Sequence, residues 1–262
     1  YQRYENLQRE QKVRSLSIAN NARSRLQETL YNSLSATKIL SFYIDEQGTV
    51  KGFDSIAIQI LNTHKHIDAL QLVPNGVIRY VYPLAGNAKV LGYYILNDSA
   101  RNKEAIKAIQ KNTMFFSGPY ELRQGGFGIV GRLPVFRQGK FWGFSAVVIK
   151  MTTLLRAAEI DSSGKNGYYY QLSKVNAQTG QKENFIPYKH TLPTAHSVSV
   201  DVPNGEWELS VTPVNPYRRY RDIVSLGVLG LLLSLLGGVF AYNEARKPQR
   251  LNQLVKERTM QL

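Results

Sequence analysis

The sequence has 262 residues, enough for one large domain or two small ones. Hydrophobic residues make up 43% and charged residues 20%, so a disordered, collagen-like or low-complexity chain is excluded. The absence of cysteine excludes disulfide scaffolds, thiol catalysis and thiolate metal sites. The net charge of +14 favours an anionic partner, either nucleic acid or a membrane surface.

Residues 1–47 contain neither glycine nor proline, and apolar residues recur along them at helical spacing. This pattern predicts one long helix that ends at Gly48. A helix of this length outruns a small domain, so we expect part of it to act as a stalk or a dimer surface. Leu26 and Leu30 are the residues expected in that interface.

The pattern becomes mixed after Gly48. Asn75-Gly76 between two apolar runs is a strong hairpin signal. We expect helices at residues 55–65, capped by Asp54, and at 99–112, capped by Asp98, with strands at 70–73, 77–82, 90–96, 127–136 and 141–149.

A smaller region follows, with a helix at 151–160 and strands at 167–175, 198–202 and 206–211. The order of elements predicts an α+β fold with two PAS-like subdomains, each built on an antiparallel sheet. The expected divisions are a stalk helix at 1–47, a membrane-distal ligand-binding unit at 48–150, a membrane-proximal unit at 151–216, a transmembrane helix at 223–242 and the start of a cytoplasmic coiled-coil linker at 243–262.

The uncharged run at residues 223–242 would span about 30 Å as a helix, the thickness of a bilayer core. Five basic residues follow this run and three precede it, which favours a cytoplasmic C-terminus and places residues 1–220 in the periplasm or outside the cell. Gly230, Ser234 and Gly238 would allow two such helices to approach closely. Because the chain begins at Tyr1, we expect an export signal upstream, most simply a first transmembrane helix.

No catalytic or metal-binding set emerges from the sequence. His64, His66 and Asp68 lie at the predicted end of a helix, where at most two of them share a face, whereas zinc needs three or four ligands. Residues 126–131 match the dinucleotide pattern G-x-G-x-x-G, but a strand-like segment follows instead of a helix. We therefore expect no metal, no cofactor and no catalysis in this segment, and a periplasmic enzyme is the weakest of the alternatives.

Aromatic residues cluster on or beside the first predicted sheet, and a charged residue in an apolar run there needs a partner. This pattern suggests an aromatic-walled pocket for a small planar or anionic ligand, and the alternative is an ordinary core with exposed tyrosines. The predicted ligand-binding residues are Tyr80, Tyr82, Tyr94, Phe115, Phe116, Gln124 and Arg132.

Four stretches carry a family resemblance: YVYPLAGNAKVLGYYI at 80–95, FFSGPYEL at 115–122, GRLPVF at 131–136 and GFSAVVI at 143–149. They resemble the CHASE domain, the extracellular sensor of many histidine kinases and nucleotide cyclases. The resemblance implies a homodimer, formed through stalk and transmembrane helices, that binds its ligand in the membrane-distal unit. Plant members bind cytokinins through an acidic residue at the position of Tyr94 and carry a small polar residue at that of Arg132, so both departures favour a different ligand.

The leading hypothesis is therefore the sensor half of a membrane receptor in the inner membrane. Its output would be a histidine kinase or, as the alternative, a diguanylate cyclase. A membrane-anchored module that binds polyanions is the competing hypothesis, and it predicts affinity that falls steeply with salt. The leading hypothesis expects no nucleic acid partner.

Overall fold

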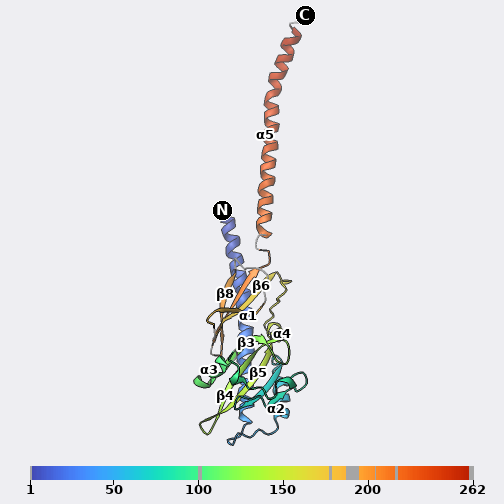
Figure 1. Ribbon diagram of the computed structural model, residues 1–262. Coiled ribbons are helices and arrows are strands. Elements are labelled where there is room, and N and C mark those ends of the chain that lie inside the picture. The colour runs from blue at the N-terminus through green and yellow to red at the C-terminus, as the bar shows by residue number, and fades with distance from the viewer. Residues whose placement is uncertain are drawn as a thin grey trace. The chain divides into compact units, whose positions relative to one another are not determined.

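The computed structural model describes residues 2–99, 102–176, 179–186, 195–203, 205–215 and 218–259. It has a long N-terminal helix α1 (Gln2–Phe42), two antiparallel sheets and an apolar C-terminal helix α5 (Arg218–Thr259) (Figure 1). Both sheets belong to one compact unit, Arg9–Val214, and α5 belongs to a second unit. The predicted α+β class is confirmed.

The first sheet has the strand order β2-β1-β5-β4-β3, and all neighbouring strands are antiparallel. The predicted hairpin forms, because Asn75 and Gly76 both take the positive φ angles that its tight turn requires. The strands are β1 (Ala69–Pro74), β2 (Tyr80–Tyr82), β3 (Phe115–Glu121), β4 (Phe127–Arg137) and β5 (Lys140–Lys150).

Two local predictions in this region are wrong. Residues 90–96 do not form a strand, because Gly92 has a φ of 81° and the chain turns there; Tyr94 makes an isolated bridge to Val77. Asp98 does not cap a helix, because its carboxylate accepts a hydrogen bond from Tyr93 instead. The elements that do form are α2 (Phe53–Thr63), the short 3₁₀ turns η1 (Ala88–Val90) and η2 (Ile95–Asn97), and α3 (Lys103–Lys111).

Gly52, and not Asp54, precedes the first residue of α2. Gly52 has a φ of 65°, a left-handed conformation that glycine adopts without strain. Asp54 lies in the first turn, where a negative charge is still favourable beside the unpaired N–H groups of the helix.

The second sheet has the order β7-β6-β9-β8 and is also antiparallel. Helix α4 (Met151–Ala157) follows β5 and leads toward it. Three of the four strands match the predicted segments, and β7 is an addition. The strands are β6 (Tyr168–Val175), β7 (Lys182–Asn184), β8 (His196–Val202) and β9 (Gly205–Pro213).

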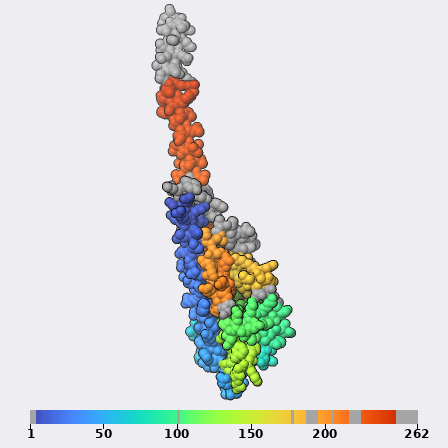
Figure 2. Space-filling model, turned by 90° about the vertical axis from the view of Figure 1, so that its left-hand side faces the viewer, coloured from blue at the N-terminus to red at the C-terminus, as the bar shows by residue number. Residues whose placement is uncertain are grey.

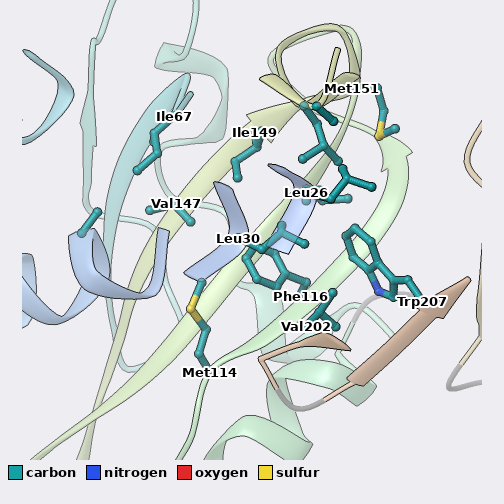
Figure 3. Packing of buried hydrophobic residues seen from close by; sticks show 14 of the residues in the cluster. Leu26, Leu30, Ile67, Met114, Phe116, Val147, Ile149, Met151, Val202 and Trp207 are labelled. Atoms are coloured by element: carbon teal, nitrogen blue, oxygen red, sulfur yellow. The ribbon is translucent and has the colours of Figure 1, made fainter. Parts of the chain in front are cut away.

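Helix α1 runs along both sheets, and Figure 2 shows it in blue beside the orange strands of the second sheet. Its apolar stripe is buried within the chain: Leu26 and Leu30 are both 0% exposed. They pack in one cluster with Phe116 and Val147 of the first sheet and Trp207 of the second (Figure 3). The prediction that Leu26 and Leu30 form a dimer interface is therefore wrong, because the helical period reveals a buried face without revealing what buries it.

Truncating this stripe should destabilise the chain itself. We expect Leu30→Ala to lower the free energy of unfolding by about 2–5 kcal/mol, because it removes buried methyl groups and leaves a cavity. Urea denaturation followed by circular dichroism measures the change. Asn21→Ala, on the exposed side of α1, is the matched control and should change stability by less than about 0.5 kcal/mol. Equal effects of the two substitutions would contradict the observed packing.

Helix α5 contains the apolar segment Val224–Lys247, 24 residues with a hydropathy of 2.3, long and apolar enough to cross a membrane. This segment contains all but the first residue of the predicted span at 223–242. Tyr242 and Arg246 lie near its end, with the guanidinium 4.4 Å from the ring centroid. Residues 260–262, the last of the predicted linker, lie outside the described residues.

His66 lies between α2 and β1, with the ring centroid of His64 5.9 Å away. Burial lowers the pKa of His66 below its ordinary value of 6.5, the nearby His64 lowers it further, and Glu28 of α1 opposes the shift. The Nε2 atom is buried and has no hydrogen-bond partner among the described residues. The folded chain therefore favours neutral His66.

This environment makes the fold sensitive to acid. Because the pKa of His66 is lower in the folded than in the unfolded chain, its contribution to stability is complete above pH 6.5 and is lost as the pH falls through the folded-state value. We expect His66→Phe to reduce the loss of unfolding free energy between neutral pH and about pH 5. Urea titrations across that range test this, and an unchanged loss in the variant would contradict it.

Candidate ligand-binding site

The two faces of the first sheet have different neighbours, because successive side chains of a strand point to opposite faces. One face packs on α1 and carries three of the predicted site residues, Tyr80, Tyr82 and Phe116. The other face packs against the chain segment between β2 and β3, which contains η1, η2 and α3. The predicted set is thus divided between the two faces of the sheet.

A second apolar core lies between the sheet and this covering segment. Val90 of η1, Ile95 of η2 and Ala105 and Ala108 of α3 are buried in it. The sheet contributes Ala69, Val73, Val81, Phe115, Val130, Phe144, Ala146 and Val148. Polar side chains on this same face are therefore held in a largely apolar space.

Two such polar side chains share one row across the sheet. The register pairs Gln71 with Ala146, Ala146 with Arg132, and Arg132 with Phe115. Gln71 of β1 and Arg132 of β4 thus flank Ala146 of the intervening strand β5. Their backbones are about 10 Å apart across the sheet, which is two inter-strand spacings. This row places an amide and a guanidinium on either side of the small side chain of Ala146.

Arg132 is held by two hydroxyl groups from β3. Its Nη1 donates to Ser117 Oγ, and its Nη2 donates to Tyr120 OH at 3.2 Å. Residues 117 and 120 would point to opposite faces of a regular strand, but the register shifts between them. Gly118, with a φ of 97°, permits this irregularity. As a result both hydroxyls lie on the covered face, 3.2 Å from each other.

The charge of Arg132 is buried without a counter-ion. The residue is 6% exposed, and among the described residues no carboxylate lies within salt-bridge distance of it. Two neutral hydroxyls accept hydrogen bonds from its N–H groups but leave its charge uncompensated, which is costly in an apolar setting. The side chain of Gln71 is also buried, at 4% exposed.

The covering segment is fastened at one edge by Tyr93. The Tyr93 hydroxyl donates to Asp98 Oδ2, and the guanidinium of Arg123, from the turn between β3 and β4, lies 3.7 Å from the Tyr93 ring centroid. Burial, followed by the hydrogen bond to Asp98, raises the pKa of Tyr93 above 10.0. The phenol is therefore neutral at physiological pH and remains a donor. These contacts join the cover to the β3–β4 turn.

The remaining predicted residues lie around this site. Phe115 is buried beside Arg132 in the same row. Tyr94 precedes η2 in the cover and is 47% exposed, and Gln124 lies half-buried in the β3–β4 turn. Phe115 thus lies beside Arg132, Tyr94 lies in the cover and Gln124 lies in the β3–β4 turn, and these four stay predicted ligand-binding residues.

Sequence reasoning missed Gln71, Ser117 and Tyr120. Gln71 carries the same signal that singled out Arg132, a polar residue inside an apolar run, here Leu-Gln-Leu-Val. Ser117 and Tyr120 gave no such signal, because only the irregularity at Gly118 puts them on one face. To predict that these two side chains share a face, one must know the strand register.

The histidines and their neighbour do not form a metal site in the described part of the chain, where no group of three metal-ligating side chains occurs. Asp68 serves a structural role, since its carboxylate accepts hydrogen bonds from the Lys150 N–H and the Thr153 hydroxyl.

The fold is similar to sensor domains of known structure. An extracellular ligand binding receptor from Desulfohalobium retbaense DSM5692 matches with a TM-score of 0.59 at 14% identity, over 76% of this chain and 40% of that one. The ligand-binding domain of the Pseudomonas aeruginosa PAO1 amino acid chemoreceptor PctB, in complex with L-Arg, matches with a TM-score of 0.57 at 11% identity, over 77% and 94%. The ligand-binding domain of the Pseudomonas fluorescens chemoreceptor CtaA, in complex with L-isoleucine, matches with a TM-score of 0.56 at 12% identity, over 81% and 94%.

These likenesses establish the fold, and no curated protein matches the sequence. Helix α5 is long and apolar enough to cross a membrane. The family model of the CHASE domain matches residues 7–185, more than half of the chain. The chain therefore belongs to the CHASE domain family and is an extracellular ligand-sensing module.

Proposed function

We propose that the chain senses a small molecule carrying a carboxylate group and binds that group at Arg132. The observation that carries the proposal is the buried guanidinium on the covered face, which has hydroxyl partners but no counter-ion among the described residues. A carboxylate can take two N–H groups of an arginine at once, a strong and directional pairing. Gln71, across Ala146, would bind a second polar group of the ligand.

The ligands of similar structures support this class of molecule. These domains are in complex with γ-aminobutyrate for PctC, L-Arg for PctB, and L-isoleucine, L-serine and L-valine for CtaA. Each of these molecules has a carboxylate, so amino acids are the first compounds to test. Binding would favour one arrangement of the cover over another, which is what allows a ligand to shift a signalling equilibrium.

Arg132→Met should weaken binding of an amino acid or other carboxylate about 10- to 100-fold, the cost of losing a charge-assisted hydrogen bond. A thermal-shift screen of the standard amino acids and small dicarboxylates identifies the ligand, because a compound that binds the folded chain raises its melting temperature. Isothermal titration then compares the wild type with the variant.

Arg156→Met on α4 removes an exposed arginine and is the matched control, so it should bind as the wild type does. Circular dichroism confirms that both variants are folded. Equal affinity of Arg132→Met and the wild type would refute the proposed site. Affinity that falls steeply with salt in all three proteins would favour the polyanion-binding alternative.

We further propose that the full protein is a homodimeric receptor with a cytoplasmic C-terminus, whose output domain is a histidine kinase or, second, a diguanylate cyclase. The basic residues that follow the apolar segment support this orientation. We also propose a division between two subdomains at residue 150, where β5, the last strand of the first sheet, ends.

A further inference from the structure

A cavity of about 420 Å³ lies at the edge of the first sheet, where the outer strand β3 meets α3 and the second sheet. Phe115 and Phe116 of β3 line it from the two faces of the first sheet, and Lys174 of β6 and Trp207 of β9 line it from the second sheet. Figure 3 shows Phe116, Trp207 and Val202 close together. Neither Arg132 nor the hydroxyls that hold it line this cavity, and Phe115, the neighbour of Arg132 in the sheet, is the residue shared with the first site.

The aromatic side of the cavity is rigidly packed. The Trp207 ring meets Phe116 edge to face with centroids 6.1 Å apart, and it meets Phe185 at 4.7 Å. Trp207 is 4% exposed. This side of the cavity therefore offers an apolar aromatic surface.

The polar side contains charges of both signs. The ammonium of Lys174 is buried, with 8% of its side chain exposed, and lies 3.3 Å from Glu104 of α3. That contact uses one of three N–H donors, and among the described residues the ammonium makes no other hydrogen bond. Lys107 and Glu206 line the cavity as well and are exposed. Two lysines and two glutamates thus line the cavity beside its aromatic residues.

We propose that this cavity is a second ligand site and that it binds a small zwitterion with an apolar body. The carboxylate of the ligand would take the free donors of Lys174. Its ammonium group would pair with Glu206, and its apolar part would lie against Trp207 and Phe116. The equal numbers of positive and negative side chains favour a molecule without net charge.

A ligand bound in this cavity would change the affinity of the first site for its own ligand. Helix α3 covers the first site with Ala105 and Ala108 and lines the second cavity with Glu104 and Lys107. A ligand that moves α3 in one site changes the affinity of the other, and the effect is reciprocal. The second site does not rest on the first, because Arg132 does not line the cavity.

Tryptophan fluorescence tests the proposal directly. The chain has two tryptophans, so Trp142→Phe leaves Trp207 as the sole reporter on the cavity wall. We expect L-phenylalanine and L-leucine to change its emission with saturation. For phenylalanine, 3-phenylpropionate lacks the ammonium group and phenethylamine lacks the carboxylate, and both should bind at least 10-fold more weakly.

Two variants in the Trp142→Phe background separate binding from folding. Lys174→Met should abolish the saturable change, whereas Glu104→Gln should strengthen binding several-fold, because it frees the Lys174 ammonium for the ligand. A purely structural ion pair would lose stability in both variants and would show no gain in affinity. Lys182→Met removes a lysine that does not line this cavity and should leave the change intact.

Arg132→Met keeps the two proposals apart, because it should leave the Trp207 response in place even where it abolishes binding at the first site. The second site is refuted if neither amino acid changes Trp207 emission at millimolar concentration. It is equally refuted if Lys174→Met responds as its parent does.

Discussion

The burial of the apolar stripe of α1 against both sheets is the interaction on which the rest of the structure depends. Leu26, Leu30 and Leu40 are 0% exposed, and each contributes about 1.5–3 kcal/mol by burial. This single helix gives the two sheets a continuous core and covers one face of the first sheet. The opposite face must then be covered by other means, and the segment between β2 and β3 provides the cover.

The two faces of the first sheet differ in the elements that cover them. The α1 side is closed by a long helix with large apolar residues, whereas the other side is closed by two 3₁₀ turns and the nine-residue helix α3. Short elements with few buried contacts open at lower cost than a long packed helix. The covered face also holds the uncompensated charge of Arg132. The proposed site at Arg132 thus lies under the side of the sheet that is covered by the shorter elements.

The structure explains which features the sequence could predict. Local patterns were sufficient for the long helix, for the Asn75-Gly76 hairpin and for β4 and β5, since each depends on residues adjacent in the chain. The prediction of a strand at residues 90–96 failed because the apolar residues there suggested a strand, whereas the chain turns at Gly92. The prediction of a dimer interface at Leu26 and Leu30 failed because a periodic apolar stripe indicates that a face is buried, but not which surface buries it.

The site was predictable to a similar degree. Arg132 stood out because a charge in an apolar run needs a partner, and Gln71 carried the same signal unnoticed. The separation of Tyr80, Tyr82 and Phe116 from Arg132 required the strand register, because one residue of offset moves a side chain to the other face. Ser117 and Tyr120 required the irregularity at Gly118, which has no counterpart in the apolar pattern.

The most direct test of the central claim is a crystal structure of the chain with the carboxylate ligand that the thermal-shift screen identifies. We expect the ligand between the first sheet and the segment that contains η1, η2 and α3, with its carboxylate oxygens within hydrogen-bond distance of the Arg132 guanidinium. A ligand bound elsewhere, with Arg132 still bonded to Ser117 and Tyr120 alone, would contradict the account.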